Sequence, residues 1–476
     1  MKLVLKFFSI STFLIIVSCT NNNQVLEAEN SINSIELEKH IIALSSDEFQ
    51  GRKPFTVGEE KTTQYIANEF KKMGIEGAYE GNYFQEVPLV GLNFIPDNSI
   101  DLNTKNGLLT LFNTKDFIAK TQHLVDSVEI NNAEIIFAGY GIVAPEYGWD
   151  DYKNIDVKDK IVLVLVNDPG FATQNNDLFK GNSMTYYGRW AYKYEEAARQ
   201  GAKGIFVIHS TEAAGYGWQV LTNTSSSGLS TQAIDKNLKK CAVEGWITDV
   251  ICKKLFEKSN LNFERLIKKA ETPNFKAMSL DCELNLTIRT KLKFQNSKNV
   301  VGLIKGSKRP EECIVYSAHW DHFGIGPVHN GDSIYNGAMD NATAISAMLE
   351  TAKAFANLKQ KPERSIVFVS ITAEETGMHG SKYFMDHGIF PPEKTIANLN
   401  YELFLLMGKM KDVTITGFGQ SELDNYVKEA AKEQDRYIIE EPFPENGMYF
   451  RSDHFNFAKK GIPSLFIKGW QDSREN

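Results

Sequence analysis

The sequence lacks an excess of positive charge. Its 476 residues include 52 Lys and Arg against 60 Asp and Glu, which gives a formal net charge of −8 at pH 7. Nucleic-acid binding depends on positive surface charge, and no basic stretch compensates, so the sequence argues against a nucleic-acid partner. Hydrophobic residues make up 42% of the chain, which excludes wholesale disorder, and the length favours two or three domains.

Cysteine is also scarce, with five in the chain. No spacing between them resembles a zinc knuckle, so we expect no cysteine-ligated metal site. Cys241, Cys252, Cys282 and Cys313 could form two disulfides in an oxidising compartment, although the sequence does not define the pairing. Cys313 lies in an apolar run and is expected in a core.

The apolar run at the N-terminus is too short to span a bilayer comfortably. Residues 7–17 follow Lys2 and Lys6 and end just before Ser18 and Cys19, which is typical of an export signal. A small residue directly before cysteine resembles a bacterial lipobox. The resemblance implies a lipoprotein signal peptide over 1–19 and a membrane-anchoring lipid on Cys19; an ordinary signal peptide with a chance cysteine is the alternative. We expect an exported lipoprotein at the outer membrane, cell surface or periplasm of a bacterium.

Hydrophobic periodicity divides the remaining chain into three parts after a flexible linker at residues 20–30. Residues 31–124 begin with two amphipathic helices and resemble the opening of a domain completed later. Residues 125–275 are strand-rich and predict an inserted domain. Residues 276–476 alternate strands with helices, which predicts an α/β fold with a mostly parallel central sheet and helices on both faces. Ligands gather at the carboxyl ends of strands in such sheets.

Metal-competent side chains cluster directly after apolar, strand-like runs. The clusters are residues 317–322, 336–341, 372–377, 398–402 and 451–455. Each cluster alone is a weak signal, because adjacent charged residues are usually solvated. Together they bring His, Asp and Glu to the same end of one predicted sheet. Imidazole and carboxylate ligands without cysteine suit a hydrolytic zinc site, with manganese or cobalt as substitutes.

The spacing within the first cluster favours one histidine over another. Residues two apart share a side of a strand, so Asp321 is predicted to orient His319, whereas His322 is expected to point the other way. In the third cluster, one of Glu374 and Glu375 can bind metal while the other accepts a proton from bound water.

The clusters resemble, in order and spacing, the signature of the M28 family of zinc peptidases. The matching blocks are 317–324, 335–341, 373–381, 398–402 and 452–463. Residues 133–220 resemble a protease-associated (PA) domain inserted in that family, and the likeness covers nearly the whole mature chain. The resemblance implies a zinc-exopeptidase type of fold with a β-rich PA domain.

Residue by residue, the resemblance implies two zinc ions. His319 and Glu402 would bind one zinc, Glu375 and His454 would bind the other, and Asp340 would bridge them. Glutamate stands at position 402, where many members have aspartate. The chain also ends soon after 463–468, whereas members usually continue, which indicates a truncated C-terminal end.

The resemblance also implies the catalytic roles. Glu374 would be the general base and Asp321 would orient a ligand histidine, while Tyr449 and Arg451 are both candidates for stabilising the oxyanion. The expected function is an aminopeptidase acting on peptides. A single-zinc acyl transferase of the glutaminyl-cyclase type and a non-catalytic, receptor-like binding module are the alternatives. The presence of both His319 and Glu402 favours two metals and disfavours the single-zinc acyl transferase. The presence of both Glu374 and Glu375 disfavours the non-catalytic module.

Overall fold

The computed structural model describes residues 24–404, 408–469 and 471–474. The proposed signal peptide and Cys19 lie outside these residues, so the lipoprotein prediction stays a prediction. Within the described ranges, no helix combines the length and hydrophobicity needed to cross a membrane.

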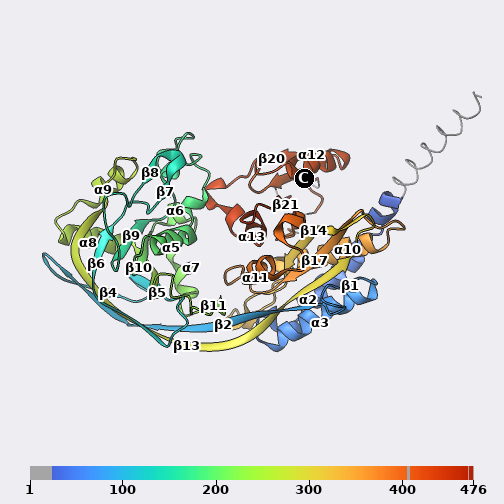
Figure 1. Cartoon of the computed structure of the whole chain (residues 1–476), viewed down its shortest axis with the longest axis horizontal. Helices are drawn as coiled ribbons and strands as arrows, with labels where there is room; N and C mark the ends of the chain where they lie inside the picture. Colours follow the sequence, from blue (N-terminus) through green and yellow to red (C-terminus); the bar gives the residue numbers. More distant parts are fainter. Residues whose placement is uncertain (1–23, 405–407, 470, 475–476) are drawn as a thin grey trace, which may run out of the picture. The chain divides into compact units, whose positions relative to one another are not determined.

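The chain divides into two compact units (Figure 1). Unit 1 consists of Met1–Val87, Asn296–Glu441 and Ser452–Asn476, and unit 2 consists of Pro88–Gln295 and Pro442–Arg451. Both main boundaries fall inside long strands, β2 (Phe84–Pro96) and β13 (Met278–Ile304). Unit 2 is therefore larger than the predicted insertion at 125–275.

The difference at the first boundary has a physical cause. The strands between residues 84 and 120 find their partners within unit 2: β3 (Ser99–Thr104) pairs with β4 (Gly107–Phe112), and β5 (Phe117–Lys120) pairs with β12 (Val243–Thr248). Because β5 and β12 are distant in sequence, their pairing leaves no local signal, so periodicity could not assign the segment around β5 to the insertion.

Unit 1 is built on a mostly parallel sheet. Its central strand β14 (Arg309–His319) runs parallel to β17 (Arg364–Ile371) on one side and to β18 (Thr395–Asn400) on the other. β18 in turn runs parallel to β21 (Ser464–Lys468), and β13 adds an antiparallel strand beside β17. The remaining strands of this unit are β1 (Glu76–Gly77), β15 (Gly324–His329), β16 (Asp332–Tyr335), β19 (Asp412–Ile415) and β20 (Tyr437–Ile439). The predicted α/β class is confirmed.

Helices cover both faces of this sheet. The main helices of the unit are α2 (Ser34–Leu44), α3 (Val57–Lys72), α10 (Thr343–Ala356), α11 (His379–His387), α12 (Leu423–Glu433) and α13 (His454–Ala458). Because side chains alternate along a strand, Ile366 and Phe368 of β17 share a core with α2, α3 and α10, whereas Val367 and Val369 share one with α11 and α13.

Helix α3 shows why these segments form helices. The Thr56 side chain accepts a hydrogen bond from the Gly58 amide and caps the first turn. Lysines in the last turn complement the helix dipole. Ile66 and Phe70, four residues apart, are fully buried on the same face, so packing on the sheet stabilises the helix.

Glu59 is a buried carboxyl on α3 that should make stability depend on pH. It is 2% exposed, and burial raises its pKa from 4.5 to about 7, opposed by hydrogen bonds from Phe55 and Ser297. Between these pH values the folded state holds a proton that the unfolded state has lost, so the free energy of unfolding falls as pH rises. We expect a loss of about 3 kcal/mol across this window.

Urea unfolding at several pH values checks this expectation. Glu59→Gln keeps the side chain's size without its titration and should remove this part of the pH dependence. Glu60→Gln is the matched control, because Glu60 is 67% exposed and pairs only with Lys298 at the surface. Equal pH profiles for wild type and Glu59→Gln would contradict the expectation.

Unit 2 contains a parallel core of its own. β10 (Gly204–His209) lies between β9 (Ile161–Leu165) and β12, and β6 (Ser127–Phe137) runs parallel to β9. The other main elements are β7 (Val143–Ala144), β8 (Trp149–Asp150), β11 (Ser227–Thr231), α4 (Pro169–Thr173), α5 (Trp190–Arg199), α6 (Thr211–Ala214), α7 (Trp218–Asn223), α8 (Asp249–Lys258) and α9 (Phe263–Ala270). The four described cysteines are buried free thiols, and Cys313 lies in the unit 1 core as predicted.

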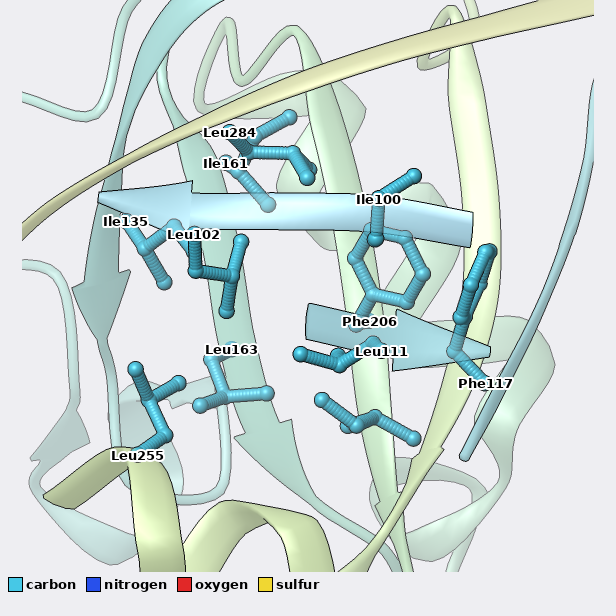
Figure 2. Close-up of a pocket in the computed structure, with 11 residues that line it drawn as sticks. Ile100, Leu102, Leu111, Phe117, Ile135, Ile161, Leu163, Phe206, Leu255 and Leu284 are labelled. Carbon is cyan, nitrogen blue, oxygen red and sulfur yellow. The ribbon is translucent and has the colours of Figure 1, made fainter. Parts of the chain in front are cut away.

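An apolar pocket lies within the core of unit 2 (Figure 2). The labelled side chains are all aliphatic or phenylalanine: Ile100, Leu102, Leu111, Phe117, Ile135, Ile161, Leu163, Phe206, Leu255 and Leu284. Catalytic and ligand sites need a few converging polar groups, and this lining has none. The chemistry of the chain therefore has to be sought elsewhere.

Candidate metal centre

The parallel strands of unit 1 bring three sequence clusters to one edge of the sheet. In the register of the sheet, His319 at the end of β14 lies opposite Ile371 at the end of β17. Ser317 of β14 lies opposite Asn400, the last residue of β18. The segments that follow β17 and β18 carry Glu374 and Glu402, so these carboxylates emerge beside His319.

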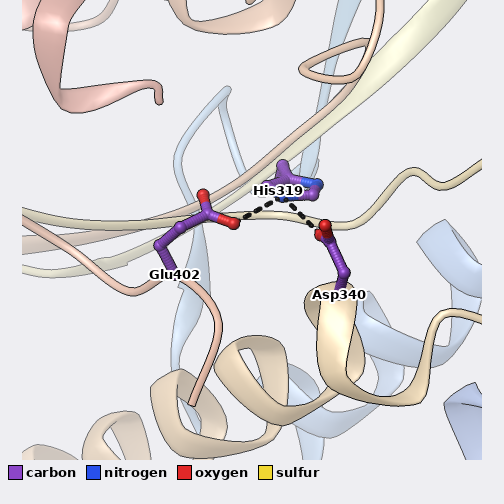
Figure 3. A group of neighbouring side chains, drawn as sticks. All are labelled: His319, Asp340 and Glu402. Atoms are coloured by element: carbon purple, nitrogen blue, oxygen red, sulfur yellow. Dashed lines mark hydrogen bonds and ion pairs between the residues drawn. The ribbon is translucent and has the colours of Figure 1, made fainter. Parts of the chain in front are cut away.

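The first group of possible metal ligands is His319, Asp340 and Glu402 (Figure 3). The His319 Nε2 atom lies 3.2 Å from Asp340 Oδ1 and 3.1 Å from Glu402 Oε1. His319 is 1% exposed and Glu402 7% exposed. The three ligand atoms lie within 4.8 Å of one another, which is close enough for a single cation to contact all of them.

A second group is formed by His322, Asp340 and Glu375, and its ligand atoms also lie within 4.8 Å of one another. His322 Nε2 lies 3.7 Å from Glu375 Oε1, and its other ring nitrogen meets the Tyr335 carbonyl at 2.9 Å. The expectation that His322 points away from the site is wrong. β14 ends at His319, so the alternation of side chains does not extend to His322.

Asp340 belongs to both groups. It lies in the short helical turn Ala338–Ala342, between β16 and α10. A carboxylate shared by two groups is the arrangement expected of a bridge between two cations. The other predicted ligand, His454, belongs to neither group among the described residues.

His454 is fully buried at the start of α13, with its ring centroid 5.2 Å from that of Phe466. The two residues before it do reach the candidate site. Ser452 Oγ donates a 2.6 Å hydrogen bond to Glu402 Oε2, and the charge of Asp453 contributes to the raised pKa of Glu374. The N-terminal end of α13 therefore adjoins the metal-binding side chains.

Asp321 supports the site mainly through its carboxylate's contacts with backbone amides. Its Oδ1 accepts from the Glu374 amide at 3.0 Å and its Oδ2 from the Glu375 amide at 3.3 Å. The His319 Nδ1 atom lies 3.1 Å from the Asp321 carbonyl oxygen and 3.8 Å from the carboxylate. Asp321 thus holds the turn that carries the two glutamates as well as facing the histidine ring.

Sequence reasoning missed Ser452 as a supporting residue, although it lies inside the fifth cluster. Its hydroxyl donates to Glu402 and accepts from Asn400 Nδ2 at 2.8 Å. Ser317 Oγ donates to Asn400 Oδ1 at 2.7 Å, which completes a buried chain of hydrogen bonds. These hydrogen bonds fix one carboxylate oxygen of Glu402 and leave the other oxygen facing His319.

Arg52 is a second supporting residue whose role the sequence did not reveal. It is 1% exposed, and its guanidinium donates to main-chain carbonyls on both sides of the site. The acceptors are the carbonyls of Leu44 at 2.7 Å, Trp320 at 2.8 Å, Asn336 at 2.6 Å, Gly337 at 2.8 Å and Asp340 at 3.3 Å. Burial lowers its pKa to about 10, so it stays charged at neutral pH.

We expect Arg52→Gln to lower the free energy of unfolding by more than about 3 kcal/mol, because several buried carbonyls lose their donor. Zinc affinity should fall with it, since the loop carrying Asp340 loses its anchor. Thermal melting and zinc titration measure both effects. Arg309→Gln is the control: this arginine is 40% exposed and pairs at the surface, so its loss should cost less than about 1 kcal/mol. Similar results for both variants would contradict the role of Arg52.

The electrostatics of the site indicate a missing positive charge. Burial, followed by the charge of Asp340, raises the pKa of Glu375 to about 8, and burial raises that of Asp453 to about 7. Burial disfavours a charged His319 ring. The carboxylates of Glu402 and Glu374 outweigh this effect of burial and raise the pKa of His319. Among the described residues, no hydrogen-bond donor reaches the buried Glu375 Oε1. A set of carboxylates and imidazoles with such an excess of negative charge fits divalent zinc.

The part of the chain that carries these donors is similar to known proteins. Residues 299–475 match the model of a family described as Peptidase family M28. Aminopeptidase NAALADL1 of Rattus norvegicus is 28% identical over 165 residues, which cover 34% of this chain and 20% of that protein. Aminopeptidase YwaD of Bacillus subtilis is 30% identical over 190 residues, 38% of each chain. The chain thus spans less than two fifths of the length of these relatives.

A solved structure extends the likeness in fold. The aminopeptidase from Aneurinibacillus sp. strain AM-1 superposes with a TM-score of 0.50 and 18% identity, covering 94% of this chain and 87% of that one. At this identity the likeness concerns the fold alone. Both donor groups and Glu374 lie within the segment that the family model matches. Residues 299–475 are therefore similar to peptidase family M28.

Proposed function

We propose that the chain is a zinc-dependent aminopeptidase that hydrolyses the N-terminal peptide bond of peptides. The observation that carries the proposal is the position of Asp340 in two adjoining groups of metal ligands, with Glu374 beside them. The match of residues 299–475 to the M28 family model and the activity in the names of NAALADL1 and YwaD support it.

The proposed ligands follow from the two groups. His319, Asp340 and Glu402 would hold one zinc, and Asp340 with Glu375 would hold the other. We assign the imidazole of the second ion to His454, because the residues preceding it touch the site, and regard His322 as the competing ligand. Two bound zinc ions would supply a water of lowered pKa and polarise the peptide carbonyl.

Glu374 is the proposed general base. Its Oε2 lies 3.9 Å from His319 Nε2, and it is held in place by the Asp321 carboxylate through its own backbone amide. Burial, together with the charges of Glu402 and Asp453, raises its pKa and makes its carboxylate a stronger proton acceptor. In the proposed reaction Glu374 takes the proton of the attacking water and returns it to the leaving amine.

The lipobox-like Ser18-Cys19 supports export and anchoring through a lipid on Cys19. The strand-rich composition of unit 2 and the resemblance of residues 133–220 support its assignment as a PA domain.

A substrate screen tests the proposed activity. Purified protein is assayed with aminoacyl and dipeptide chromogenic substrates, with and without a chelator, and chelated samples are then resupplied with zinc. We expect hydrolysis at the N-terminal residue that disappears with the chelator and returns with zinc. N-terminally acetylated peptides serve as the matched control and should not be cleaved. Cleavage of acetylated peptides at the same rate would contradict an aminopeptidase.

A further inference from the structure

A buried arginine, Arg189, and a half-buried one, Arg451, lie close together within unit 2. Arg189, immediately before α5, is 8% exposed, and burial followed by the charge of Arg451 lowers its pKa to about 10. The Arg451 guanidinium lies 5.7 Å from the ring centroid of Tyr216. The Tyr216 side chain interacts electrostatically with both arginines, so the three side chains form one cluster.

Neither guanidinium has an acidic partner in the described part of the chain. No Asp or Glu forms an ion pair with Arg189 or Arg451, and only tyrosines favour their charged forms. The Nε and Nη2 atoms of Arg451 are buried without a hydrogen-bond acceptor. Both groups remain protonated in proteins, so two like charges lie side by side in a partly desolvated environment. A buried charge without a partner is costly, which is why such groups are normally paired.

The arrangement is held firmly. Arg451 ends the segment Pro442–Arg451, which belongs to unit 2 although the rest of its sequence neighbourhood belongs to unit 1. The Pro444 carbonyl accepts from the Met184 amide at 3.0 Å, and Glu445 accepts from Asn182 at 3.1 Å.

Two glycines leave no room for side chains where this segment packs. A Cβ atom on Gly215 would lie 2.3 Å from Asn446 Oδ1, and one on Gly447 would lie 2.6 Å from Met184 Sδ. The segment therefore fits closely against unit 2, so Arg451 is positioned by packing rather than by a counter-ion.

We propose that Arg189 and Arg451 form a binding site for a carboxylate. Guanidinium groups bind planar carboxylates through paired hydrogen bonds, and the aromatic ring of Tyr216 suits an organic ligand better than a free inorganic anion. The ligand is the C-terminal carboxylate of a short peptide. The choice of a peptide as the ligand rests on the proposed function, whereas the carboxylate site itself does not.

Binding measurements on the full-length, zinc-supplied protein test the site separately from the activity. The Glu374→Gln background prevents turnover, and calorimetry compares trialanine with trialanine amide. The wild-type site should favour the free carboxylate by about 10- to 100-fold, the effect of hydrogen bonds to a charged group. Arg189→Gln or Arg451→Gln should each abolish most of this preference, Arg189→Lys only part of it, and the exposed Arg265→Gln none.

Further probes identify the source of the carboxylate. Ala-Glu-Ala amide could bind more tightly than trialanine amide, and this advantage could disappear in the arginine variants. That result would support the site, but its ligand would then be an acidic side chain. Equal binding of acid and amide, or stronger competition by inorganic phosphate than by acetate, would overturn the proposal. Arg451→Gln decides the matter if the more buried Arg189→Gln fails to fold. A protein without hydrolytic activity that still shows the carboxylate preference would refute the proposed function alone.

Discussion

Glu374→Gln is expected to lower kcat by about 10²- to 10⁴-fold while KM and zinc content stay unchanged. Glutamine keeps the shape of the side chain and the backbone contact with Asp321, but it cannot accept the proton of the attacking water. Because Glu374 belongs to neither group of metal ligands, a glutamine side chain at this position should leave zinc binding intact. Steady-state kinetics on an aminoacyl substrate and metal analysis of the same sample measure the two quantities.

A second glutamate provides the control for this result. Glu393→Gln makes the same substitution at an exposed position of unit 1 and should leave kcat within experimental error of wild type. Loss of zinc together with activity would make Glu374 a ligand instead of a base. Full activity with zinc bound would remove it from the mechanism.

Asp340→Asn is expected to remove both zinc ions and, with them, all hydrolytic activity. Asp340 is the one residue that the two donor groups share, so weakening it affects both. We expect zinc affinity to fall by more than about 100-fold, beyond the loss seen for residues that only orient a ligand. Metal analysis after dialysis gives the stoichiometry, and Asp332→Asn, at an exposed site on β16, is the control. Retention of two zinc ions would contradict a shared ligand.

Single-ligand variants separate the two ions. Glu402→Gln and His454→Asn should each leave one zinc per chain, because each residue is assigned to one ion only. His322→Asn should keep two. If His322→Asn loses a zinc and His454→Asn does not, the second imidazole is His322, as its 3.7 Å distance to Glu375 would allow.

Much of unit 1 could be predicted from the sequence because its signals are local. The alternation of strands and helices predicted over 276–476 is present in the structure, for example in β14, α10 and β17. Parallel strands then place their carboxyl ends together, which is why His319, Asp340 and Glu402 could be expected to meet. The structure places these three within a single cluster.

Features that depend on contacts between distant segments could not be predicted. The guanidinium of Arg52 binds carbonyls up to 288 residues away, and no periodicity marks such a role. The alternation of side chains along a strand ends with β14 at His319, so it does not predict the direction of His322. The segment Pro442–Arg451 gave no sign that it packs with unit 2, since its sequence neighbours form unit 1.

Anomalous diffraction at the zinc edge, from crystals grown with zinc, tests the central claim most directly. The account predicts two peaks at bonding distance, about 2.0–2.2 Å, from the oxygens of Asp340. One peak should also contact His319 and Glu402, and the other should contact Glu375. Zinc density elsewhere, with none at bonding distance from Asp340, would contradict the account.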